Sequence, residues 1–378
     1  MTAPAKIAMR LYLGAALPSP APEAVLRSLT SAQVIRKDND PGGFQLTFNA
    51  DRTKGAGADY GLLQSPLLKP GIRAVIAVQM NGTETILIDG FITNQELSHD
   101  RQFGGAALTV SGEDVSYAMD RVELSLEFPQ MGDSMIVAAA LAKYSAVAAP
   151  LVSPTATDLI PMEEERTPQQ NSTDRAMVKQ LAGVHGYIFC IQPTPVLGVN
   201  TAYWGPPRIG PTAPALTVDM GSATNVETLS FHQDASAPVL MYGFVQDRDT
   251  EEDMPLATTT STRLPPLAAD PALDVANPLQ ARRLFVDPRY GYLRAMADAQ
   301  AVTDISTDRV VTATGVVDTT RYGAVLEAPG LVAVRGVGRS YDGRYYLPEV
   351  THQFTRGTYR QSFTLTREGT GSTIERVA

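Results

Sequence analysis

The chain has 378 residues, which is too long for one ordinary hydrophobic core and predicts two or three domains. With 44% hydrophobic and 19% charged residues it has the composition of a globular protein, and no apolar run reaches the roughly 18 residues that a membrane-spanning helix needs. A net charge of −9 without any Lys/Arg run argues against general nucleic-acid binding. The single cysteine, Cys190, excludes an internal disulfide framework and fits a reducing compartment.

Residues 1–118 are predicted to form a first all-β domain. In the stretch 43–50 the apolar residues Phe44, Leu46 and Phe48 alternate with polar ones, so they share one face of a strand. The strand over 71–80 is followed by Asn81-Gly82, a strong signal for a tight hairpin turn. The pattern therefore favours an antiparallel sheet with one buried face.

Residues 119–225 are predicted to form an α/β insert. One helix is expected within 132–146, and a second is capped by Ser172 or Thr173. Glycines end the second helix, and the apolar run "YIFCI" that follows reads as a buried strand containing Cys190. We interpret Cys190 as a buried apolar side chain and not as a reactive thiol.

Residues 226–378 are predicted to form a second all-β domain. The segment 247–283 is polar and rich in Pro, Thr and Ala, so we expect a long loop or arm there. A helix is predicted over about 287–303. The strands that follow this helix end in a C-terminal hairpin, "DGRYYLPEVTHQFTRGTYRQSFTLTRE".

This C-terminal hairpin repeats the plan of an earlier one, "DGFITNQELSHDRQFGGAALTVSGED". In both, an Asp-Gly pair is followed at identical spacing by a glutamate, a histidine and a glycine, and a Pro-Gly opens an upstream strand. The matched positions are Asp89, Gly90, Glu96, His99 and Gly104 in the first copy, and Asp342, Gly343, Glu349, His352 and Gly357 in the second. The chain is therefore predicted to contain two versions of one β-barrel-like unit around the insert.

The last strand of the second copy has a polar face made of Arg360, Ser362, Thr364 and Thr366. If the sheet continues between subunits, this face lines a water-filled lumen. If the barrel is solitary, the same face meets bulk solvent. The pattern alone leaves both arrangements open.

Equivalent histidines in two repeats invite a metal or catalytic interpretation. We prefer a structural one, in which His99 and His352 each bridge a backbone carbonyl across the turn, because no second His or Cys lies at ligand spacing from either. The sequence also lacks a GxSxG nucleophile elbow, an HExxH motif and a P-loop. We therefore predict no catalytic residues, no metal and no cofactor.

The two hairpins, the segment "STDRAMVKQLAGVHGYIFCI" and the helix "GDSMIVAAALAKY" together resemble the phage late control D proteins, which are baseplate hubs of contractile tails. The chain is similar in the same way to the hub part of type VI secretion spike proteins and of extracellular contractile injection systems. The resemblance covers most of the chain, and the C-terminal hairpin is its most specific part.

The resemblance implies a mainly β fold with an α/β insert, in which two tube-like barrels per chain assemble as a homotrimer into a pseudo-six-fold ring. Such a hub adapts the six-fold inner tail tube to the three-fold spike and forms a central channel. Its partners would be the tube protein, a separate spike protein, since no β-helical repeat follows the second unit, and baseplate wedge proteins. It would be assembled in the bacterial cytoplasm and belong to the phage-tail or injection-system particle. The acidic balance suggests a lumen that repels nucleic acid.

Two other functions remain open at this stage. A tail-associated cell-wall hydrolase would use carboxylate catalysis and would clear peptidoglycan as a monomer. A carbohydrate-binding adhesin would need an exposed aromatic cluster, for which "YGY" at 290–292 and the pair Tyr203 and Trp204 are the candidates.

Overall fold

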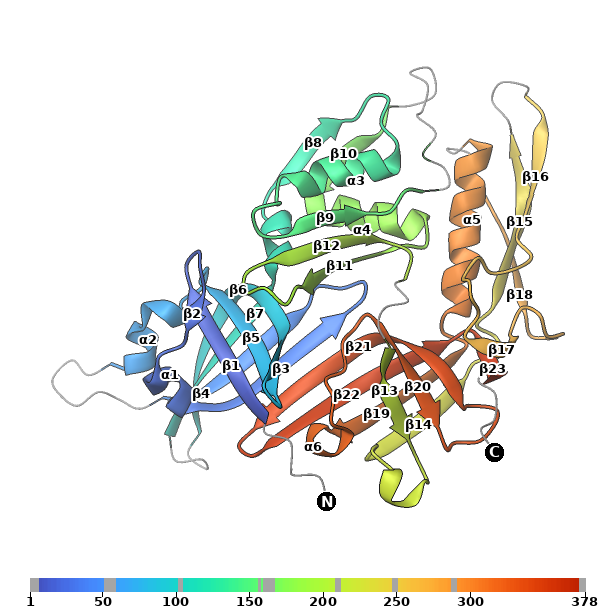
Figure 1. Ribbon diagram of the computed structural model, residues 1–378. Coiled ribbons are helices and arrows are strands. Elements are labelled where there is room, and N and C mark those ends of the chain that lie inside the picture. Colours follow the sequence, from blue (N-terminus) through green and yellow to red (C-terminus); the bar gives the residue numbers. More distant parts are fainter. Residues whose placement is uncertain are drawn as a thin grey trace.

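The computed structural model describes residues 7–50, 59–100, 105–155, 158, 167–207, 212–246, 251–286 and 291–373. The chain is mainly β, and its largest element is a 13-stranded sheet that runs through both predicted all-β domains (Figure 1). The strands contributed by the N-terminal half are β1 (Ile7–Gly14), β2 (Ser19–Pro20), β3 (Leu29–Lys37), β4 (Gly43–Ala50), β5 (Arg73–Met80), β6 (Thr83–Asp100) and β7 (Gly105–Asp114). Those from the C-terminal half are β13 (Thr212–Thr217), β14 (Thr228–Gln233), β19 (Val311–Asp318), β20 (Gly330–Arg335), β21 (Gly343–Thr355) and β22 (Thr358–Arg367).

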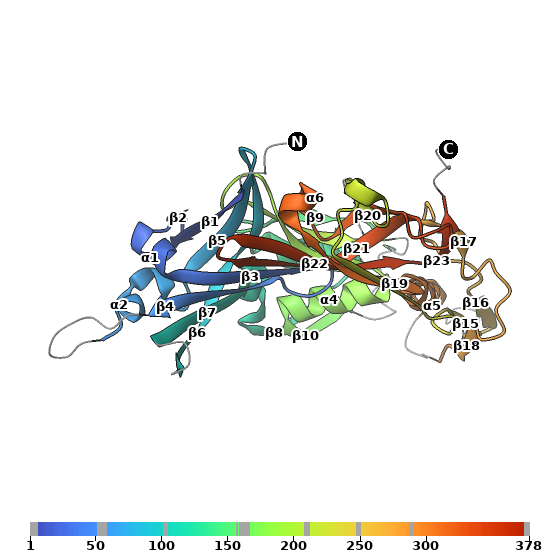
Figure 2. The same cartoon turned by 90° about the horizontal axis from the view of Figure 1, so that it is seen from below.

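The two halves of this sheet have the same strand order. The N-terminal half runs β3-β4-β7-β6-β5-β1, and the C-terminal half runs β14-β19-β22-β21-β20-β13. The outermost pair differs, because β1 is antiparallel to β5 whereas β13 is parallel to β20. No pairing among the described residues closes either half into a barrel. Figure 2 shows the two halves side by side, with β3 of the first beside the strands of the second.

Alternation of apolar and polar residues gives strands such as β4 one buried and one polar face, whereas β5 is buried on both faces. In β4 the predicted set Phe44, Leu46 and Phe48 is buried, at 4% exposure or less. The turn at Asn81 and Gly82 joins β5 to β6 with positive φ angles of 52° and 92°, as a two-residue hairpin turn requires. Both local predictions are confirmed.

The insert has its own core around Trp204, which is fully buried. Thr173 caps the second helix by accepting a hydrogen bond of 3.2 Å from the amide of Ala176, and Cys190 lies buried in the strand that follows, so both predictions are confirmed. Its elements are η2 (Val115–Asp120), β8 (Glu123–Glu127), α3 (Asp133–Ala142), β9 (Ala149–Val152), β10 (Gln169–Thr173), α4 (Asp174–Val184), β11 (Ile188–Pro193) and β12 (Asn200–Gly205). Strand β13 falls within the predicted 119–225 insert but belongs to the large sheet, through β20.

The predicted long loop or arm over 247–283 differs from the structure in its described part, because three short strands interrupt it. Strand β16 (Asp253–Ala257) pairs with β15 (Val239–Gln246), β18 (Ala281–Leu284) pairs with the other side of β15, and β17 (Ala268–Pro271) pairs with β23 (Gly369–Ser372). Pro255 argued against a strand at β16 in the sequence, but proline is tolerated there because β16 has an unpaired edge. The predicted helix is α5 (Tyr292–Thr307), which packs on β15 with a small core of its own.

The remaining elements are short helices. They are α1 (Glu23–Ser28), α2 (Gly61–Gln64), η1 (Pro66–Leu68), η3 (Gly221–Ala223) and α6 (Thr319–Tyr322).

Candidate functional site

The two halves of the chain are joined by direct strand pairing. The C-terminal part of β21 runs antiparallel to β3, from Glu349 opposite Lys37 to Thr355 opposite Ser31. An ion pair of 3.8 Å links Lys37 to Glu349, and the Tyr346 hydroxyl donates a hydrogen bond of 3.1 Å to a carboxylate oxygen of Asp38. We call this β21–β3 pairing the seam.

The apolar side of the seam joins the two cores. Phe354 and Tyr359 come from the second half, yet they pack into the buried cluster of the first half. Their rings stack with centroids 4.1 Å apart. The C-terminal hairpin singled out in the sequence is therefore the element that fastens the second half to the first.

The matched histidines lie in opposite environments. His352 is fully buried at the seam, and its Nδ1 is 2.9 Å from the Tyr359 hydroxyl. Burial, reinforced by the nearby Arg36 guanidinium, lowers the pKa of His352 to about 3. His99 is exposed at the end of β6, where its Nε2 bonds the Tyr60 hydroxyl. The predicted bridge to a backbone carbonyl across the turn is wrong for His352, whose partner is a tyrosine hydroxyl. For His99 the turn lies outside the described residues, and the partner within them is also a tyrosine hydroxyl.

The first Asp-Gly pair fastens the first half to the insert. Asp89 is buried and receives two hydrogen bonds of 2.7 Å from Arg73 and one of 2.9 Å from the Asn200 amide in β12. Gly90 passes so close to β7 that a Cβ there would lie 2.0 Å from the Glu113 carbonyl oxygen. Only glycine fits at this position.

The second Asp-Gly pair shapes a turn instead. Asp342 accepts a hydrogen bond of 2.9 Å from the amide of Val337, and Gly343 opens β21 with a φ of +133°. Gly357, at φ +83°, occupies the two-residue turn between β21 and β22. Its counterpart Gly104 lies outside the described residues. The matched Asp-Gly pairs therefore have different structural roles in the two copies.

Cross-strand registers reveal a correspondence that the linear sequence hides. Each half contains a row of directly opposed residues of the order Ser-Thr-Thr-Glu. The first row is Ser31, Thr47, Thr109 and Glu96, and the second is Ser230, Thr314, Thr364 and Glu349. Both rows end on the glutamates that the motif matched. The serine and threonine members of the rows were not predicted from the sequence, because strand register and not spacing along the chain places them opposite one another.

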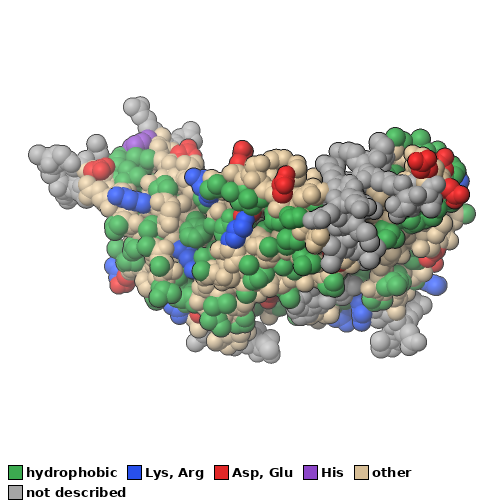
Figure 3. All heavy atoms as spheres, turned by 90° about the horizontal axis from the view of Figure 1, so that it is seen from above, with side chains coloured by type: hydrophobic (Ala, Val, Ile, Leu, Met, Phe, Trp, Pro, Cys, Tyr) green, Lys and Arg blue, Asp and Glu red, His purple; other side chains and the backbone are tan. Residues whose placement is uncertain are grey.

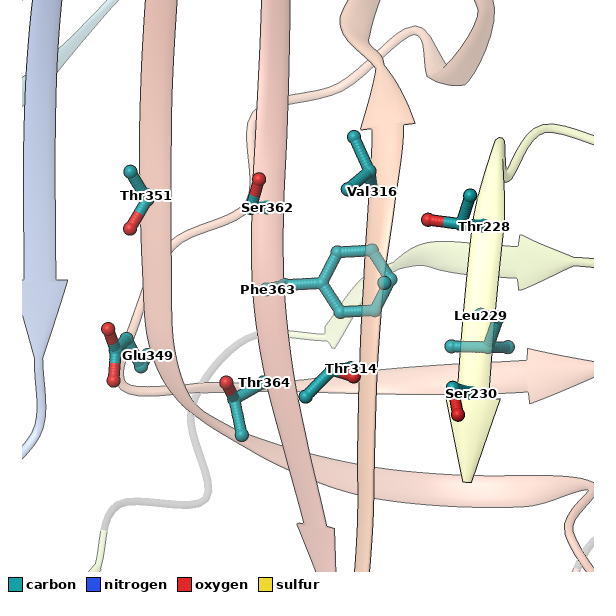
Figure 4. Close-up of a pocket in the computed structure, with 11 residues that line it drawn as sticks. Thr228, Leu229, Ser230, Thr314, Val316, Glu349, Thr351, Ser362, Phe363 and Thr364 are labelled. Carbon is teal, nitrogen blue, oxygen red and sulfur yellow. The ribbon is translucent and has the colours of Figure 1, made fainter. Parts of the chain in front are cut away.

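The second row lies in a hollow of about 410 Å³ on the polar face of the sheet, shown in Figure 4. Its walls are mostly hydroxyl side chains from β14, β19, β21 and β22. The lining residues are Thr228, Leu229, Ser230, Thr314, Gly315, Val316, Glu349, Thr351, Ser362, Phe363 and Thr364.

Two ion pairs lie on this part of the polar face. Lys37 pairs with Glu349 across the seam, and Arg360 pairs with Glu227 at 3.3 Å. The second row is therefore rich in hydroxyls, and its one carboxylate is matched by a lysine.

Within the described ranges, no cluster of three or more His, Cys, Asp or Glu side chains has the arrangement of a metal site. No helix there is long and apolar enough to cross a membrane. Trp204 and Tyr203 are 0% and 7% exposed, so this pair is not the surface platform that an adhesin would need, and Tyr290 lies outside the described residues.

No protein-family model and no curated protein matches the chain. Solved structures do match it over nearly its whole length. A tail protein from Neisseria meningitidis MC58 and the 43 kDa tail protein of prophage MuSo2 from Shewanella oneidensis each align with a TM-score of 0.61 at 13% identity. These alignments cover 95% of this chain and 97% or 98% of the other.

A third match is the E. coli c3393 protein, a component of the type VI secretion system described as structurally similar to the T4 tail proteins gp27 and gp5. It aligns with a TM-score of 0.54 at 11% identity, over 90% of this chain and 73% of that one. The predicted resemblance is thus confirmed at the level of structure, and the chain has the fold of these phage tail and type VI secretion proteins.

Proposed function

We propose that the chain is a structural baseplate hub of a contractile phage tail or contractile injection system. In this role it forms a trimeric ring that adapts a six-fold inner tube to a three-fold spike and encloses the central channel. The shared fold of phage tail and type VI proteins supports the general role. The arrangement of paired and unpaired strand edges supports the ring.

The single observation that carries the proposal is that each chain forms the β21–β3 seam but, among its described residues, has no equivalent pairing between β6 and β14. β21 has β3 beside its C-terminal part, but the equivalent part of β6, from Thr93 onward, has β7 on one side and no strand on the other within the described chain. β14, which corresponds to β3 in strand order, likewise pairs with β19 alone there. Unpaired edges of this kind are templates for pairing with another chain.

A second copy of the chain can satisfy both edges at once. Its β14 would lie along β6 as β3 lies along β21, and the Ser-Thr-Thr-Glu rows give the register. His352 is opposite Val34, three residues after Ser31, so His99 should be opposite Gln233, three residues after Ser230. Three chains with two units each would then close a ring of six similar units.

This ring would explain why one chain carries two unequal copies of a unit. Six similar units can match a six-fold tube on one side of the ring. The differences between the copies keep the other side three-fold, as a separate trimeric spike requires. Wedge proteins would bind the outside, the hydroxyl-lined face would form the channel wall, and the protein would reside in the particle. No catalytic role is proposed, and clearing of peptidoglycan by the monomer would contradict this account.

Cross-linking tests the predicted register directly. The variant carrying His99→Cys and Gln233→Cys places thiols on two exposed positions whose Cα atoms should be about 4.5–5.5 Å apart across the new strand pair, within reach of a disulfide. Native Cys190 is 4% exposed and burial raises the pKa of its thiol to about 12, so it should not compete.

Mild oxidation should convert this variant into covalent dimers and trimers. The matched control pairs His99→Cys with Gln246→Cys, which is exposed on β15, and it should stay monomeric on a denaturing gel. Equal cross-linking of both variants, or of neither at concentrations where the chain self-associates, would contradict the proposed β6–β14 pairing.

A further inference from the structure

The three-stranded sheet β16-β15-β18 has an uncovered apolar face. Its inner face packs on α5, whereas four large side chains project outward from β15, β18 and the residue pair after β18. Tyr242 and Phe244 are 49% and 70% exposed, and Leu284 and Val286 are 58% and 75% exposed. Tyr242 is opposite Leu284, so these side chains form one continuous patch. Patches of this kind on a folded chain mark interaction sites.

This patch points away from the rest of its own chain. α5 separates the sheet from the insert (Figure 1) and is tied to the insert on its other side. Arg294 of α5 makes an ion pair of 3.1 Å with Asp133 at the start of α3, and Arg263 donates a hydrogen bond of 2.7 Å to the Gly186 carbonyl. Within the described chain the four side chains stay 49–75% exposed, so the outer face is open to another molecule.

The two edges of the sheet carry opposite charge, so a partner would be oriented. On the β18 edge, Arg282 and Arg283 are exposed, and neither forms an ion pair with a described residue. The opposite edge, at β16, is acidic because Glu251 and Asp253 are exposed there. Seen from above, hydrophobic and acidic side chains gather together at this end of the molecule (Figure 3).

A complementary surface exists on the same chain, out of reach of its own patch. The ribbon formed by β8 and β10 lies on the side of the insert that faces away from α5 in both ribbon views. Val122, just before β8, and Leu126 are 62% and 40% exposed, and the exposed carboxylates of Glu123 and Glu127 lie on the opposite face of the strand. Apolar and acidic side chains therefore meet along the edge of β8 that pairs with no described strand, and this edge matches the apolar patch and its basic edge.

We infer that the outer face of the β16-β15-β18 sheet binds the β8–β10 ribbon of a second copy of this chain, with Arg282 and Arg283 next to Glu123 and Glu127. The inference rests on the proposed ring. In that ring, the insert of one chain would lie beside the β16-β15-β18 sheet of the next chain. Within each chain α4 contacts α5, and the inferred contact would join the insert and the sheet of neighbouring chains at the next position around the ring.

A charge swap tests this contact in the full chain. The variant with Arg282→Glu and Arg283→Glu should need at least tenfold more protein to form the trimer than the native chain does, as measured by sedimentation at physiological salt. Adding Glu123→Lys and Glu127→Lys to the same chain should restore most of that loss, because the reversed charges attract again. Phe244→Ser should weaken assembly comparably, whereas Val196→Ser, at a 61% exposed tip elsewhere in the insert, should not.

The outcomes separate this inference from the ring itself. If reversal of the arginines leaves assembly unchanged while the His99–Gln233 cross-link still forms, the ring stands and the patch has another occupant. Weakening without rescue by the lysines would also overturn the assignment to β8. If the native chain forms neither the cross-link nor a trimer, the ring and the inference fall together.

Discussion

The buried imidazole of His352 makes the seam sensitive to acid. In the folded chain the pKa of His352 is about 3, whereas an unfolded histidine titrates near about 6.5. Below the unfolded value the unfolded chain gains a proton that the folded chain excludes, so stability falls as pH falls. The interval of about 3.5 units corresponds to about 4–5 kcal/mol lost between pH 6.5 and 3, at about 1.4 kcal/mol per unit.

Substitution with a side chain that does not titrate isolates this effect. His352→Gln should lower stability at pH 7 by about 1–3 kcal/mol, because it disturbs a fully buried ring and its hydrogen bond to Tyr359. Between pH 6.5 and 4 the native chain should then lose stability faster than the variant by about 1.4 kcal/mol per unit, so the two curves converge. The matched control is His99→Gln, since His99 is exposed.

Hydrogen exchange read by mass spectrometry is the suitable assay, because it reports β3 and β21 separately from the insert. The native chain should lose protection in these two strands first as the pH falls, and His352→Gln should flatten that dependence. A variant with the same acid profile as the native chain would show that His352 does not control the seam.

Two other substitutions test the local physics. Burial raises the pKa of Asp38 to about 6 despite the hydrogen bond from Tyr346, so this carboxylate lowers the stability of the fold as pH rises from about 4 to 6. In chemical denaturation, Asp38→Asn should therefore stabilise the chain by about 2 kcal/mol at pH 7 and by little at pH 4. An equal gain in stability at both pH values would contradict the raised pKa. Gly90→Ala should destabilise the fold by about 3 kcal/mol or more, because the new Cβ would meet the Glu113 carbonyl oxygen. The control Gly183→Ala on α4 meets no atom within 4 Å and should stabilise the chain by about 0.5–1 kcal/mol. Similar shifts in melting temperature for both variants would refute the close approach at Gly90.

Local patterns in the sequence predicted the local elements well. The alternation in β4, the Asn81-Gly82 turn and the Thr173 cap depend on neighbours only a few residues away, so their physical causes are visible in the letters. The chain-wide motif match also selected Glu96 and Glu349, which end equivalent rows of the sheet.

The missing parts depend on long-range pairing. The seam joins strands more than 300 residues apart in the sequence, and the local sequence of β3 or β21 does not indicate which strand it pairs with. The tyrosine partners of the two histidines are set by packing for the same reason. Strand β16 was overlooked because Pro255 is a strand breaker except at an unpaired edge, and that edge exists only in the folded sheet.

The ring can be tested most directly by the mass of the purified chain in light scattering, alone and after mixing with candidate tube and spike proteins. We expect a particle of about three times the 40.5 kDa of one chain, formed alone or on addition of spike. A stable monomer that binds neither protein would contradict the hub function.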